Sequence, residues 1–168
     1  MQIEVKVKIT NTKSIEKKIK QLGAKFWKET TEKDTYFHSQ KGVFKVKESS
    51  DGECILVHDY RPKESNIAAL RTEVPLDTMY AEKLKGVLQD TVGVQLILEK
   101  KRKQYIYHGV LLAIDAITHH DTFFEITSDE IPEKDGEKEK QKLIDLLKGF
   151  GFSEKDLETK AYNDVYLP

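Results

Sequence analysis

Charged residues recur at every second position in several short segments of this sequence. The pairs are Glu4 with Lys6, Lys45 with Lys47, Arg71 with Glu73, and Lys100 with Arg102. Residues two apart in an extended chain point to the same side, so each pair would place two charged groups on one face of a strand. Such faces cannot form a dry core, because unpaired buried charge is strongly unfavourable. The spacing therefore indicates a solvated site for a charged ligand.

The strand expected to position the first pair covers residues 2–9, QIEVKVKI, in which polar and apolar residues alternate without a fault. Such alternation predicts one apolar face and one charged face. For this strand alone, the simpler interpretation is the edge of a sheet with its polar side in water. Later strands repeat the pattern with charges of mixed sign, which favours a shared charged face.

Further strands are predicted wherever this pattern returns between turn signals. They cover residues 34–39, 43–48, 54–61, 68–74, 94–107, 110–117 and 122–127. Tight turns join the first three of these strands, which makes them antiparallel. Apolar residues at helical spacing predict helices after Thr12 or Ser14, from Asp77, and from Leu143 to Phe150. Residues 26–33, 62–66 and 129–140 are predicted to be irregular or loops.

Unbroken alternation defines the polar side of each strand. The residues on that side are Gln2, Glu4, Lys6, Lys8, Lys45, Lys47, His58, Tyr60, Arg71, Glu73, Lys100, Arg102, Gln104, Asp115, Glu125 and Thr127. Each helix has one apolar stripe, which can cover the opposite side of the sheet. Eight antiparallel strands can close and so remove their exposed edges. We expect an α+β fold, mainly β: a closed eight-stranded antiparallel β-barrel with helices packed on the outside and a wet, charged tunnel within.

The composition restricts the class of protein. With 168 residues and 38% apolar content, the chain is expected to form a single domain over residues 1–168. The net charge of −1 provides no large basic field, and the run at 100–103 lacks an accompanying phosphate loop or stacking motif; no nucleic-acid partner is expected. One cysteine, no charged-then-apolar leader and no long apolar run favour a cytoplasmic protein with no membrane partner.

Two further groups of reactive residues receive structural interpretations. His119, His120 and Asp121 are predicted to form a solvated turn, because adjacent histidines on a turn seldom converge on one metal ion. Cys54 lies on an apolar strand without a positive neighbour in sequence, which predicts a buried, unreactive thiol.

Taken in order along the chain, the charged motifs resemble those of the CYTH family, the superfamily of triphosphate tunnel metalloenzymes. The resemblance rests on Glu4-x-Lys6, DTYF at 34–37, Lys45-x-Lys47, Arg71-x-Glu73, Lys100-x-Arg102, Asp115 and FFEI at 123–126. The short opening strand and the Tyr-Arg-Pro segment at 60–62 are most similar to the archaeal-type class IV adenylyl cyclase branch. The resemblance implies an antiparallel tunnel, open at both ends, that binds a triphosphate together with a divalent metal.

The same resemblance implies roles for individual residues. The expected triphosphate-binding residues, most of which can form charge-assisted hydrogen bonds to phosphate, are Lys6, Lys8, Lys45, Lys47, His58, Arg71, Lys100 and Arg102. Glu4, Asp115 and Glu125 match the family's ligands for Mg²⁺ or Mn²⁺, which prefer oxygen donors. Lys6, Glu4 and Glu125 are the expected catalytic residues. Glu73 and Tyr162 are expected to support the site, Glu73 by holding Arg71 or a neighbouring lysine.

Several positions depart from the family pattern. Gln2 and Thr127 stand where carboxylates are expected, Lys45-x-Lys47 replaces Arg-x-Arg, and Tyr60 is taken to replace a lysine near the end of the strand at 54–61. The first expectation is a class IV adenylyl cyclase-like enzyme that converts ATP to cyclic AMP and pyrophosphate. The alternatives are a triphosphatase acting on tripolyphosphate, thiamine triphosphate or nucleotides, and a degenerate tunnel that only binds polyphosphate or nucleotide. A homodimer is compatible with each of these.

Overall fold

The computed structural model describes residues 1–60 and 68–167. The predicted loop at 62–66 and the last two residues of the Tyr-Arg-Pro segment lie outside the described residues. The strands are β1 (Gln2–Ile9), β2 (Lys25–Phe37), β3 (Val43–Ser49), β4 (Cys54–Tyr60), β5 (Ala68–Pro75), β6 (Val94–Tyr107), β7 (Val110–Ile117) and β8 (Thr122–Thr127). The helices are α1 (Thr12–Leu22), α2 (Thr78–Thr91), α3 (Gly136–Gly149) and α4 (Tyr162–Tyr166), with 3₁₀ turns at Glu133–Asp135 and Glu154–Asp156.

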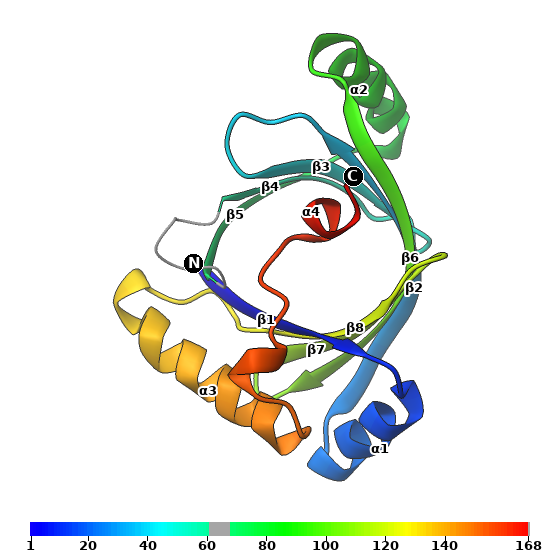
Figure 1. Ribbon diagram of the computed structural model, residues 1–168. Helices are drawn as coiled ribbons and strands as arrows, with labels where there is room; N and C mark the ends of the chain where they lie inside the picture. The colour runs from blue at the N-terminus through cyan, green and yellow to red at the C-terminus, as the bar shows by residue number, and fades with distance from the viewer. Residues whose placement is uncertain (61–67, 168) are drawn as a thin grey trace.

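The eight strands form an antiparallel, curled sheet in the order β1-β5-β4-β3-β2-β6-β7-β8 (Figure 1). β1 pairs with β8 from Glu4 to Ile9, and it also pairs with β5 through Gln2 and Ile3. The predicted α+β class, mainly β, and the eight antiparallel strands are confirmed. A single short ladder thus brings the first strand of the chain against β5.

Apolar packing fixes which face of the sheet turns inward. Val5 and Val7 of β1 are buried against α1 and α3, in a cluster that also holds Ile19 and Leu147. These helices lie outside the curl next to β1, β7 and β8, and α2 lies outside its other side (Figure 1). Burial of the apolar face against helices leaves the polar residues of β1 on the inner face of the curl.

Two segments differ from the sequence expectation. β2 begins at Lys25 and pairs with β6 along most of its length, so residues 26–33 are extended rather than irregular. α3 begins at Gly136, inside the stretch predicted to be a loop. Its Glu- and Lys-rich start consists of good helix formers, and the loop prediction gave charge more weight than helix propensity.

The C-terminal segment returns to the inside of the curl, where Figure 1 shows α4 within the curve of the strands. Leu157 forms a bridge with Val7, and the Glu158 amide donates to the Lys6 carbonyl at 2.7 Å. Tyr162 then packs with Leu98 and Phe123 in an apolar cluster on the inner face. Among the described residues, none of the helices combines the length and the apolar character required to cross a membrane.

Candidate functional site

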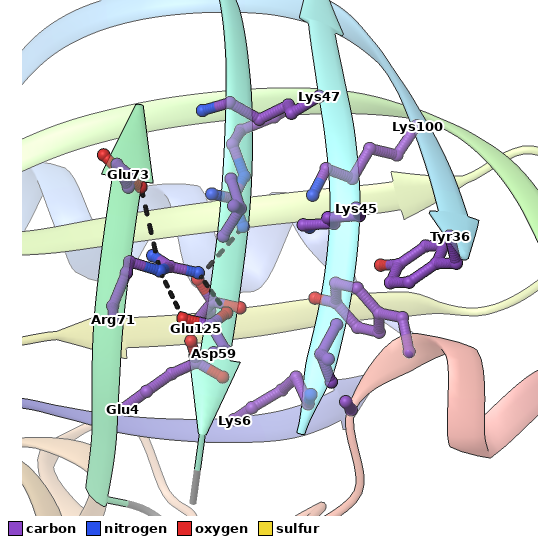
Figure 2. A pocket seen from close by; sticks show the side chains of 15 residues that line it. Glu4, Lys6, Tyr36, Lys45, Lys47, Asp59, Arg71, Glu73, Lys100 and Glu125 are labelled. Atoms are coloured by element: carbon purple, nitrogen blue, oxygen red, sulfur yellow. Dashed lines mark hydrogen bonds and ion pairs between the residues drawn. The ribbon is translucent and has the colours of Figure 1, made fainter. Parts of the chain in front are cut away.

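Charged side chains from six strands converge on a pocket at the inner face of the sheet (Figure 2). We call it the charged pocket. It is lined by Glu4, Lys6, Tyr36, Val43, Lys45, Lys47, Val57, Asp59, Arg71, Glu73, Lys100, Arg102, Glu125, Ala161 and Tyr162. All four charged pairs with a spacing of two residues therefore lie in one place, together with Glu125 and Tyr162.

Arg71 is held by a carboxylate that the sequence analysis did not place in the site. Its Nε and Nη2 donate to the two oxygens of Asp59 at 2.7 and 2.8 Å, and Glu73 Oε1 lies 3.7 Å from Nε. Burial would lower the pKa of Arg71, but the Asp59 and Glu4 carboxylates raise it. Glu73 is thus near Arg71 as expected, while Asp59 is its closer partner.

Arg102 forms the second bidentate pair. Its Nε and Nη2 donate to the two oxygens of Asp115 at 2.6 and 2.5 Å, and Nη2 also donates to Glu125 at 3.0 Å. The Tyr162 hydroxyl donates to Asp115 at 2.9 Å. Burial would raise the pKa of Asp115, but Arg102 and Lys100 lower it to about 2. Asp115 is therefore a charged partner of Arg102, fully buried behind the charged pocket.

The lysines on the other side of the pocket share two buried carboxylates of β2. Lys45 Nζ lies 2.6 Å from Asp34 Oδ2, and Lys100 Nζ lies 3.5 Å from the same oxygen and 3.3 Å from Glu32. Burial would raise the pKa of Asp34, but Lys100 and Lys45 lower it well below its ordinary value. Glu32 and Asp34 were missed because the strand was expected to begin only at Asp34. Extending its alternation back through Glu32 would have placed both on the inner face.

Glu4 and Glu125 are the predicted metal ligands that line the charged pocket. Burial and the charge of Glu4 raise the pKa of Glu125, so a divalent cation between these carboxylates would be electrostatically favourable. Their oxygen donors suit Mg²⁺ or Mn²⁺. Asp115 is not placed as a third ligand in this arrangement, because it is fully buried, does not line the charged pocket and bonds to Arg102 through both oxygens. No group of three or more His, Cys, Asp or Glu arranged for a metal occurs within residues 1–60 and 68–167.

The predicted lysine Lys8 lies outside the charged pocket. Its side chain is 59% exposed and forms an ion pair with Asp121 at 2.6 Å. It follows the alternation of β1, but Phe123, its neighbour across the β1–β8 ladder, packs with Tyr162 and fills the inner face at this level.

His58 and Tyr60 were placed on the wrong face of β4. Val57 and Asp59 line the charged pocket instead, while the His58 ring is 2.8 Å from the Lys41 carbonyl. The physical cause is α2, against which Cys54 and its neighbour Leu56 pack on the outer face of the strand. Asp59, not Tyr60, therefore occupies the inward position at which the family resemblance implied a lysine.

The remaining predicted residues lie around the pocket. Lys6 donates to the Lys160 carbonyl at 2.8 Å and lies 4.3 Å from the centre of the Tyr162 ring, so the C-terminal segment contacts the site directly. Thr127 is buried, with its hydroxyl 3.5 Å from Glu125. His120 stacks on Tyr166, away from the pocket. Cys54 is buried, as predicted, and burial raises the pKa of its thiol.

The fold and the charged pocket define an α+β protein with a highly charged inner sheet face. Residues 1–162 match the CYTH domain, and the chain belongs to this family, which confirms the resemblance seen in the sequence. Members of the family bind triphosphates with divalent metals.

Proteins from several organisms are similar to this chain. The chain is 24% identical over 175 residues to a Methanocaldococcus jannaschii protein named "Putative adenylate cyclase MJ0240", with 98% of each chain covered. It is similar to the PH1012 protein from Pyrococcus horikoshii OT3, with a TM-score of 0.85, 25% identity and 98% of both chains covered. "Putative adenylyl cyclase HpAC1" from Hippeastrum, described as having a dominant triphosphatase activity, has a TM-score of 0.62 and 16% identity, with 90% of this chain and 88% of that chain covered.

Proposed function

We propose that the charged pocket binds a triphosphate and that the chain is a class IV adenylyl cyclase-like enzyme, which converts ATP to cyclic AMP and pyrophosphate. The observation that carries the proposal is the convergence of six cations and the carboxylates Glu4 and Glu125 on one pocket. Lysine and arginine can surround phosphate oxygens with charge-assisted hydrogen bonds from several directions. The pairing of β1 with both β5 and β8 supports the further proposal that the sheet closes into a tunnel around this pocket.

The reaction needs the ribose 3′-hydroxyl to attack the α-phosphorus, release its proton to water and displace pyrophosphate. Lys45, Lys47 and Lys100 lie together on one side of the pocket (Figure 2), where they would hold the negative charge that develops on the departing pyrophosphate. Glu4 and Glu125 would hold a divalent ion, which supplies charge neutralisation at the phosphates when bound. Lys6, fixed by the Lys160 carbonyl, would position a phosphate oxygen between these groups.

A triphosphatase is the second candidate, favoured by the fold shared with the Hippeastrum protein and its described activity. Water would then attack the terminal phosphorus in the same pocket and release orthophosphate. Cytoplasmic location, a homodimer and a single domain over residues 1–168 stay predictions of the sequence.

Incubation of the purified protein with ATP, tripolyphosphate or thiamine triphosphate, in Mg²⁺ and in Mn²⁺, with chromatographic separation of the products, tests the proposal. We expect cyclic AMP and pyrophosphate from ATP. Orthophosphate release would support the triphosphatase, and intact substrates would contradict both enzyme functions. A Lys45→Met, Lys47→Met variant should lose activity, while Lys8→Ala, which alters a lysine outside the charged pocket, is the matched control.

A further inference from the structure

Asp59 is a pocket residue that triphosphate binding does not explain. It reaches the charged pocket from β4, is 8% exposed, and gives both carboxylate oxygens to Arg71. A carboxylate at this place repels a phosphate ligand, and it occupies an arginine that could otherwise bind that ligand. Its presence therefore weakens the binding of a bare anion.

The side chains around the Arg71–Asp59 pair further weaken the binding of a bare anion. In Figure 2, Arg71 lies among Glu4, Asp59, Glu73 and Glu125, whereas the labelled lysines of β3 and β6 lie across the pocket. A phosphate that takes the Nε and Nη2 donors of Arg71 displaces Asp59 and leaves that carboxylate, mostly buried, beside new negative charge; one that bonds to Nη1 instead lies next to the Asp59 carboxylate. The pair is partly buried, and removing one partner is costly because the other charge stays poorly compensated.

The second bidentate pair, Arg102 with Asp115, does not hinder phosphate binding in the same way. Asp115 lies behind the pocket, is not among its lining residues, and keeps a hydrogen bond from Tyr162 besides its bonds from Arg102. Asp59 lines the pocket directly, so the charge left on it after an exchange would face the ligand. A divalent cation that enters with the phosphate can compensate this charge, because carboxylate and phosphate oxygens are both suitable ligands for it.

We propose that Asp59 is a specificity-determining residue: by occupying Arg71 in the empty pocket, it makes the site select a polyphosphate accompanied by a divalent cation over the bare polyphosphate. The inference rests on the proposed function, since it requires a triphosphate in the charged pocket. Asp59 acts through Arg71 and is a positioning residue, not a catalytic one.

Calorimetric titration of tripolyphosphate tests the proposal, with wild type and Asp59→Asn each measured in excess EDTA and in excess Mg²⁺. Asparagine keeps the shape of the side chain but removes its charge. In EDTA the variant should bind roughly tenfold more tightly, the change expected when one charged competitor for a hydrogen bond is lost. In Mg²⁺ the gain should be much smaller, so the preference for the metal-accompanied ligand falls. Adding Arg71→Ala to the variant should remove the gain.

Two controls separate this effect from damage to the fold. Asp145→Asn alters an ion-paired carboxylate on α3, far from the pocket, and should leave both affinities unchanged. Asp59→Glu should retain the wild-type preference for the metal-accompanied ligand. Thermal unfolding is measured first, and Asp59→Ser replaces Asp59→Asn if the latter does not fold.

The outcomes distinguish this inference from the function on which it rests. If wild type binds tripolyphosphate with Mg²⁺ but Asp59→Asn binds no more tightly than wild type in EDTA, the role of Asp59 is overturned and triphosphate binding stands. If no protein binds tripolyphosphate in either buffer, triphosphate binding in this pocket is overturned, and the inference with it. A gain that survives Arg71→Ala would show that Asp59 acts by simple repulsion and not through Arg71, which also overturns the proposal.

Discussion

Loss of Asp34 should show how strongly buried carboxylates hold the cations of the charged pocket. Asp34→Asn keeps the side-chain shape but leaves Lys45 and Lys100 without their shared counter-charge at 2.6 and 3.5 Å. Breaking a buried ion pair from one side costs about 3–5 kcal/mol. Because Lys100 keeps Glu32 at 3.3 Å, we expect the lower end, about 3 kcal/mol. For a domain of this length, that corresponds to a fall of about 6–12 °C in melting temperature.

The effect of Asp34→Asn should depend on pH with a definite sign. Despite its burial, Lys100 and Lys45 hold the pKa of Asp34 well below its ordinary value of 3.8. A lowered folded-state pKa stabilises the protein above the unfolded value, and this contribution is lost as the pH falls through the folded value. The difference in unfolding free energy between wild type and variant should therefore be constant near neutral pH and narrow below about pH 4.

Urea denaturation at several pH values between 3 and 7 measures this difference. Adding Lys45→Met to Asp34→Asn should recover part of the lost stability, because replacing both charges avoids an uncompensated one. Tripolyphosphate should stabilise Asp34→Asn more than wild type, since the ligand supplies the missing negative charge. A variant within about 0.5 kcal/mol of wild type at pH 7, the range of ordinary surface substitutions, would refute the assigned role of Asp34.

Three further variants examine other parts of the site. Lys47→Ala should weaken tripolyphosphate binding by about 1.5–3 kcal/mol through loss of a charged contact, whereas Lys8→Ala should leave binding unchanged. Calorimetric titration compares the two variants. Equal losses of affinity would contradict the placement of Lys47 inside the charged pocket and Lys8 outside it. Arg102→Met should destabilise the fold by about 3–5 kcal/mol in urea denaturation, because it leaves buried carboxylates unpaired; unchanged stability would be inconsistent with those ion pairs. Glu125→Gln should abolish turnover yet preserve or tighten metal-free tripolyphosphate binding, and lost binding in EDTA would point to a structural role.

The sequence predicts the inward face correctly where polar and apolar residues alternate. β1 is the clearest case: Val5 and Val7 can only face the helices, so Glu4 and Lys6 must face inward. β4 carries apolar residues on both faces, and alternation alone cannot decide its orientation. The packing of Leu56 on α2 decides it, and this contact joins segments that the sequence does not relate.

Alternation within one strand cannot predict the ion pairs of the site, since these pairs depend on the register between neighbouring strands. Asp59 lies opposite Arg71 across the β4–β5 ladder, and Asp115 lies opposite Arg102 across β6–β7. Reading each strand alone assigns the cations to a phosphate and the acids to a metal. Placed together, both arginines already have bidentate carboxylate partners before any ligand arrives. A bidentate phosphate contact to Nε and Nη2 of Arg71 then exchanges one anion for another, and a contact to Nη1 leaves the phosphate beside Asp59. In both cases the affinity depends on the charge of Asp59 as well as on the arginine itself.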